Sequence, residues 1–60
     1  MKTKNRPTQL DYEHVELILR EANAHGLKWE VENHATKIIS KNPEIGLVEA
    51  YQLAFNEWVK

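Results

Sequence analysis

The chain has 60 residues, no cysteine and a formal net charge of −1. A chain of this length forms one domain at most and buries only about 60% of the surface that its unfolded form exposes. Its stability is therefore marginal without disulfide bonds, a bound metal or oligomerisation. The lack of cysteine excludes disulfide bonds and thiolate metal sites, which makes oligomerisation the most available stabiliser. No apolar run approaches the ~20 residues that span a bilayer, so we expect a cytoplasmic protein without membrane contact.

The first seven residues are polar and carry three basic side chains, Lys2, Lys4 and Arg6. We predict that residues 1–7 form a disordered basic arm and that residues 8–60 form a single three-helix domain. This domain has five basic and nine acidic residues, which gives a net charge of −4 (5 − 9). A folded surface that binds nucleic acid usually has the opposite sign. The arm is therefore interpreted as a solubilising tail, with phosphate binding as the alternative.

The first helix is predicted over residues 9–25. Thr8, followed three residues later by Asp11, is typical of a helix N-terminus. Gly26 is predicted to end the helix in a left-handed conformation, with Leu27 folding back onto the last turn. Leu10 and Leu17 lie on the flank of the helix. The expected buried stripe consists of Tyr12, Val15, Ile18, Leu19 and Ala22.

The second helix is predicted over residues 28–41. Residues 28–32 alternate in the manner of a strand, but a lone strand would leave its backbone groups unpaired and the chain offers no partner strand. Asn42-Pro43 is predicted to close this helix, because the residue before a proline is pushed out of helical geometry. Read as a helix, the segment places on one side Leu27, Val31, Ala35, Ile38, Ile39 and Asn42.

The third helix is predicted over residues 47–59, with Gly46 as its N-cap and Glu49 at the third helical position. The short linker of residues 42–46 predicts that the second and third helices form a compact hairpin. The chain is therefore expected to be all-α, with three short helices. The third helix is apolar on most sides, and the residues left to face water are Glu49, Gln52, Asn56, Glu57 and Lys60. Such a helix needs cover from its neighbours and from a second copy, so we expect self-association.

The aromatic residues are the best candidates for a protein interface. Trp29 lies off the apolar side of its helix, where it either anchors an interface or packs across the turn between the first two helices. Trp58 is expected to be buried, so that its truncation would cost ~3–5 kcal/mol and unfold or monomerise the protein. The candidate interface residues are Trp29, Val48, Tyr51, Phe55, Trp58 and Val59.

The sequence shows no pattern typical of catalysis or of a metal centre. A zinc site needs three or four converging ligands, whereas His14 and His25 lie too far apart to share an ion, and Glu30 with His34 offers only two ligands. A domain of this size is also expected to have little room for a pocket of ~300 Å³. We therefore expect no enzymatic activity, no cofactor and no small-molecule substrate.

The alternative function is that of a small DNA-binding regulator that uses the basic arm and the second helix. Glu30 and Glu32 on that helix count against it, as does the lack of an arginine there that could read guanine. The candidate nucleic-acid contacts are Lys2, Lys4, Arg6, Lys28, Lys37 and Lys41.

One stretch also suggests an origin. The run Asn42-Pro43-Glu44-Ile45-Gly46-Leu47-Val48-Glu49-Ala50-Tyr51, followed by Ala54-Phe55-Asn56-Glu57-Trp58, resembles the ends of small helical proteins encoded by temperate phages. In length and helical content the whole chain resembles the short early-region reading frames of lambda-like phages. The resemblance implies a non-enzymatic, dimeric early protein in the host cytoplasm. Such a protein would modulate host physiology or the lysis–lysogeny choice by binding a host or phage protein.

Overall fold

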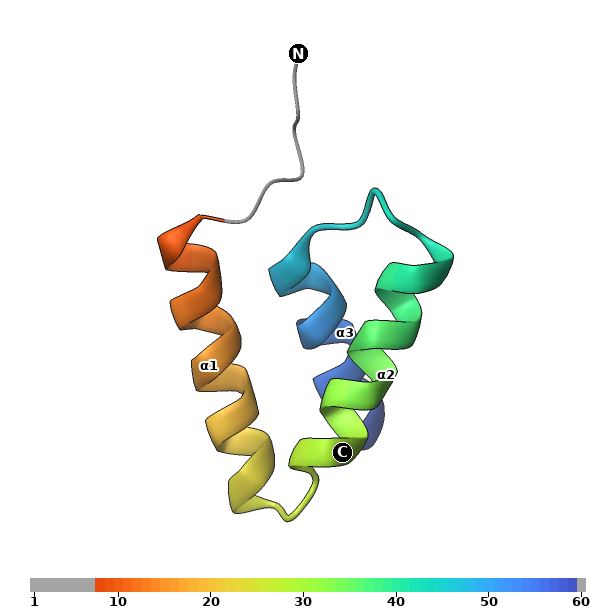
Figure 1. The fold of residues 1–60 in the computed structure, drawn as a ribbon. Coiled ribbons are helices and arrows are strands. Elements are labelled where there is room, and N and C mark those ends of the chain that lie inside the picture. The colour runs from red at the N-terminus through yellow and green to blue at the C-terminus, as the bar shows by residue number, and fades with distance from the viewer. Residues whose placement is uncertain (1–7, 60) are drawn as a thin grey trace.

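The computed structural model describes residues 8–59, which fold into three helices, α1 (Gln9–Ala24), α2 (Lys28–Lys41) and α3 (Leu47–Trp58) (Figure 1). This part of the chain contains no strand, so the predictions of an all-α fold and of a helical second segment are confirmed. The first and third helices are each predicted one residue too long at the C-terminus, because His25 and Val59 are C-caps rather than helical residues. The predicted disordered arm of residues 1–7 lies outside the described residues, as does Lys60.

The two ends of α1 are closed by side-chain and backbone hydrogen bonds. The Asp11 N–H donates to Thr8 Oγ1 over 3.2 Å, and the Thr8 N–H donates to the Asp11 carboxylate over 3.1 Å. This reciprocal pair satisfies two of the N–H groups that a helix start leaves without partners. At the other end, the Leu27 N–H donates to the Ala22 carbonyl over 2.9 Å, while Gly26 adopts a φ of 73°. A side chain at that φ would be strained, so the glycine allows the tight turn into α2.

The hairpin of α2 and α3 is built on a short turn. Asn42 caps α2, and the Ile45 N–H donates back to the Asn42 carbonyl over 3.0 Å. Gly46 is the N-cap of α3, as predicted, and its carbonyl accepts from the Ala50 N–H. Of the three helix pairs, α2 and α3 share the most extensive contact, which confirms the predicted hairpin. The chain thus runs down α1, up α2 and down α3 (Figure 1).

The core of the domain is small because alanine dominates it. Val31 is the largest side chain that is fully buried. Alanine lets helices approach closely but removes little apolar area from water. The buried residues are Val15, Ile18, Ala22, Val31, Ala35, Ala50 and Ala54. Larger side chains pack against this core only in part, namely Leu19, Leu27, Ile38, Tyr51 and Phe55.

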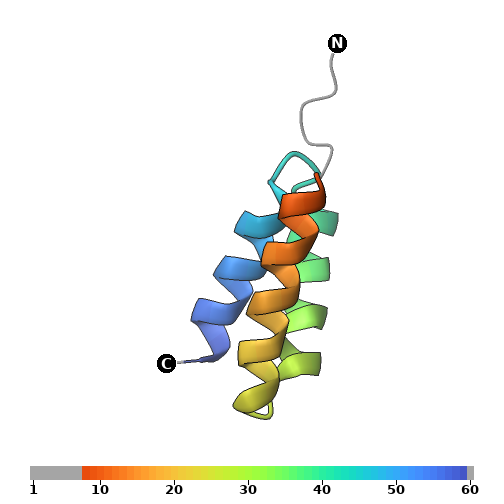
Figure 2. The ribbon, with the colours of Figure 1, turned by 90° about the vertical axis from the view of Figure 1, so that its left-hand side faces the viewer.

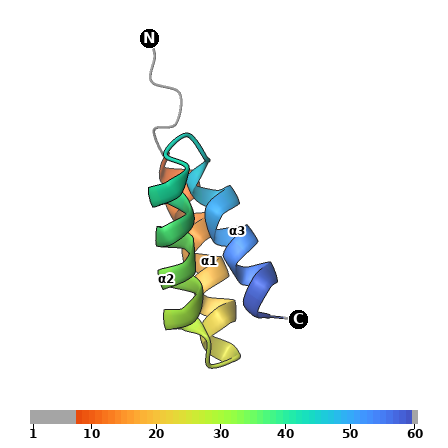
Figure 3. The same cartoon turned by 90° about the vertical axis from the view of Figure 1, so that its right-hand side faces the viewer.

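The C-terminal end of α3 diverges from the other two helices, as two views of the ribbon show (Figures 2 and 3). Trp58 lies in the last turn of α3 and is 44% exposed, so the prediction that it is buried is wrong. Leu53 was expected among the covered positions and is exposed as well. On α1, Tyr12 is 57% exposed and does not belong to the buried stripe. Among the described residues, no helix is both long and apolar enough to cross a membrane.

Candidate functional site

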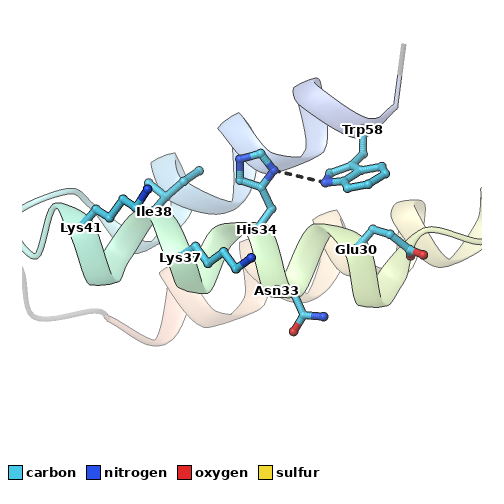
Figure 4. Close-up of a pocket in the computed structure, with 7 residues that line it drawn as sticks. All are labelled: Glu30, Asn33, His34, Lys37, Ile38, Lys41 and Trp58. Atoms are coloured by element: carbon cyan, nitrogen blue, oxygen red, sulfur yellow. Dashed lines mark hydrogen bonds between the residues drawn. The ribbon is translucent and has the colours of Figure 1, made fainter.

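A groove lies between α2 and the last turn of α3, where the two helices diverge (Figure 4). Its volume is about 390 Å³, and it is open to solvent. The expectation that the domain has little room for a pocket of ~300 Å³ is therefore wrong. The groove is lined by Glu30, Asn33, His34, Lys37, Ile38, Lys41 and Trp58.

One hydrogen bond joins the two walls of the groove. The indole Nε1–H of Trp58 donates to Nδ1 of His34 over 3.2 Å (Figure 4). The bond requires a neutral imidazole with its proton on Nε2, because a protonated imidazole has no acceptor nitrogen. It links the end of α3 to the middle of α2 and fixes the indole ring at the edge of the groove.

The charges along the groove are separated by sign. Glu30, His34, Lys37 and Lys41 follow one another at spacings of four, three and four, which places them on one face of α2. The acidic side chain lies in the first turn of α2 and the two lysines lie toward its C-terminal end. The groove therefore has a negative end at Glu30 and a positive end at Lys37 and Lys41. Trp58 lies toward the negative end and Ile38 toward the positive end, with His34 between them (Figure 4).

The third lysine of α2 is found elsewhere. Lys28 lines a second hollow of about 230 Å³, together with Glu16, Leu19, Arg20 and Asn23. At about 100° per residue, Lys28 lies on the opposite side of α2 from Lys37 and Lys41. The lysines proposed to contact nucleic acid thus do not form one surface on α2. Lys2, Lys4 and Arg6 lie outside the described residues.

Trp29 projects from the first turn of α2 and is 68% exposed. The Nζ atom of Lys28 lies 5.8 Å from the centroid of its ring, a distance at which a cation is attracted to an aromatic face. Of the two alternatives that the sequence left open, the structure favours the exposed tryptophan over one that packs across the turn.

The remaining candidate interface residues are half-buried within the chain. Tyr51 and Phe55 pack against the core, and Val48 and Val59 are only partly exposed. Burial raises the pKa of the Tyr51 hydroxyl, and the negative charge of Glu32 raises that pKa further. These side chains stabilise the bundle itself, so of the candidate interface residues Trp58 and Trp29 are the aromatic ones that remain exposed to a partner.

Neither His34 nor Ile38 was predicted as a site residue from the sequence. The spacing of residues 30, 34, 37 and 41 could have indicated a common face, but the position of Trp58 beside that face depends on how α3 diverges from α2. Among residues 8–59, no three His, Cys, Asp or Glu side chains come together in a way that could hold a metal ion. No family model, no curated protein and no solved structure matches the chain.

Proposed function

We propose that the chain is a small, non-enzymatic regulator that binds another protein through the groove between α2 and α3. The observation that carries the proposal is the groove itself, whose apolar surface comes from Ile38 toward one end and the half-exposed Trp58 toward the other. Exposed tryptophans are common anchors of protein interfaces, and Trp29 adds a second one on the same helix as the groove.

The charges of the groove define the partner segment that it fits. Apolar side chains of the partner would cover Trp58 and Ile38, and acidic side chains beyond Ile38 would face Lys37 and Lys41. A basic side chain at the other end would face Glu30. Charge complementarity of this kind contributes to orientation and association rate more than to affinity. The resemblance to early phage proteins extends the proposal to a partner in the host cytoplasm that acts on host physiology or on the lysis–lysogeny choice.

The test is affinity capture of the tagged protein from a bacterial lysate, with and without nuclease. We expect the wild-type chain to retain a protein at near-stoichiometric yield after nuclease. The double variant Lys37→Glu/Lys41→Glu should lose that protein, because it reverses the positive end of the groove. Lys28→Glu makes the same change of charge on the opposite side of α2, and it should retain the protein.

Two outcomes would overturn the proposal. If capture disappears with nuclease, the DNA-binding alternative gains support. If the double variant and Lys28→Glu both retain the protein at wild-type yield, the groove is not the binding surface. Circular dichroism of both variants should match the wild type, since all three lysines are exposed.

A further inference from the structure

One side of α1 carries large apolar side chains that the described part of the chain leaves uncovered. Leu10 is 74% exposed and Leu17 is 58% exposed. Side chains seven residues apart lie nearly above one another on a helix, and Ala24, which is also exposed, continues the row. We call Leu10, Leu17 and Ala24 the outer stripe of α1.

The outer stripe points away from the core of its own bundle. The buried residues of α1 are Val15, Ile18 and Ala22. At about 100° per residue, their mean direction lies roughly 130° from that of the outer stripe. Neither α2 nor α3 can therefore bury these leucines, and a core composed mainly of alanine has little stability to spare.

The charged residues beside the outer stripe suggest what covers it. Helical geometry places Glu13 and Arg20 along one side of the stripe, and His14 and Glu21 along the other. A parallel pair of α1 helices, related by a two-fold axis along their length, brings each side against the opposite side of the other copy. Arg20 of one copy then meets Glu21 of the other, and Glu13 meets His14. An antiparallel pair instead brings each side against itself. Centred between Leu10 and Leu17, it places Glu13 against a second Glu13; centred on Leu17, it pairs Glu13 with Arg20 but packs Leu10 on Ala24 rather than on a leucine.

We propose that the protein forms a parallel two-fold homodimer through the outer stripe of α1. Leu10 and Leu17 of each copy pack on the same residues of the other copy, at the spacing of one coiled-coil position. Burial of these four leucines supplies the affinity. The parallel orientation is the one that packs leucine on leucine at both positions, whereas the exposed charge pairs add little affinity. Within one chain, Oε2 of Glu21 lies 3.7 Å from Nε2 of His25. Both side chains are exposed, so the Glu21 carboxylate remains accessible to Arg20 of the second copy.

The first test uses an engineered cysteine, because the chain has none of its own. In the parallel dimer the two copies of residue 24 face each other, and a disulfide needs Cα atoms about 4.4–6.8 Å apart. We expect Ala24→Cys to become a covalent dimer on mild oxidation. Ser40→Cys, at an exposed position of α2, is the matched control and should remain monomeric. Equal cross-linking of the two variants would overturn the proposal.

The second test measures the dissociation constant of the dimer by sedimentation equilibrium. Leu17→Lys should raise this constant at least about tenfold, because it places a charge on the apolar contact. Leu53→Lys makes the same change at an exposed position of α3 and should leave the dissociation constant unaltered. A wild-type chain that stays monomeric at about 1 mM would overturn the proposal.

A charge exchange tests the orientation without touching the leucines. Arg20→Glu and Glu21→Arg should each weaken the dimer, by about twofold to tenfold, because each breaks two symmetric pairs. The double variant Arg20→Glu/Glu21→Arg should restore wild-type affinity, because both pairs form again with their signs reversed. A double variant weaker than either single variant would contradict the parallel arrangement. The groove between α2 and α3 takes no part in this contact, so these results are independent of partner capture.

Discussion

The contact between α2 and α3 buries small apolar side chains, whereas the outer stripe of α1 exposes large ones. Between α2 and α3, small side chains such as Ala35 and Ala54 are fully buried, and larger ones are only partly covered. On the outer stripe, Leu10 and Leu17 are large and exposed. The bundle thus closes with little apolar area, while two leucines of α1 remain at the surface. Stability and the proposed association therefore depend on different faces of this small domain.

The largest loss of stability is expected at the fully buried positions of the α2–α3 contact. Ala54 is fully buried, and Ala54→Leu adds bulk between helices that already approach closely. Overpacking of a closed site should lower the free energy of unfolding by about 2–3 kcal/mol. Urea denaturation at fixed protein concentration measures this loss.

Asn56→Leu is the matched control for this variant, because it adds the same side chain at an exposed position of α3. We expect it to leave the free energy of unfolding within about 0.5 kcal/mol of the wild type. If Ala54→Leu is as stable as Asn56→Leu, the α2–α3 contact is looser than the buried alanines indicate.

Truncation of a side chain at the edge of the same contact should cost less stability. Trp58 is 44% exposed, so Trp58→Ala should cost about 1–2 kcal/mol rather than the ~3–5 kcal/mol of a buried tryptophan. Trp29→Ala should cost less than about 0.5 kcal/mol, because its ring lies at the surface beside Lys28. Thermal unfolding of both variants measures the difference. Equal losses for the two tryptophans would contradict the placement of Trp58 against His34.

Local patterns predicted most of the helix boundaries. The caps depend on short-range chemistry, such as the reciprocal bonds of Thr8 with Asp11 and the positive φ of Gly26, so the sequence is sufficient to find them. Periodicity likewise identified Val31 and Ala35 as residues of the core.

Exposure near the helix ends could not be predicted in the same way. Periodicity gives the direction in which a side chain points, but not whether a neighbouring helix still lies there. Trp58 points along the apolar side of α3, yet α3 has by then diverged from α2 (Figure 3). Tyr12 follows the expected stripe of α1 but remains exposed. The groove depends on the angle between helices, which is set by the packing of the whole bundle.

Removal of the imidazole acceptor should release Trp58 from the α2–α3 contact. In the variant His34→Phe, the indole Nε1–H of Trp58 loses its acceptor. A single hydrogen bond of this kind contributes about 0.5–1.5 kcal/mol. In NMR spectra, we expect the Nε1–H signal of Trp58 to shift in this variant and that of Trp29 to stay in place. A Trp58 signal that stays in place as well would exclude the bond to His34.

Alkali should produce the smallest effect, through Tyr51 at the edge of the core. Burial, followed by the negative charge of Glu32, raises the pKa of the Tyr51 hydroxyl in the folded chain. A raised pKa means that the folded state holds this proton more tightly than the unfolded state, whose tyrosines titrate near about 10. The associated stability is present below that pH and is lost as pH rises through the folded-state pKa. Tyr51→Phe should therefore flatten the fall of unfolding free energy above pH ~10. Equal slopes in Tyr51→Phe and the wild type would show that Tyr51 is not the group that couples alkaline pH to folding.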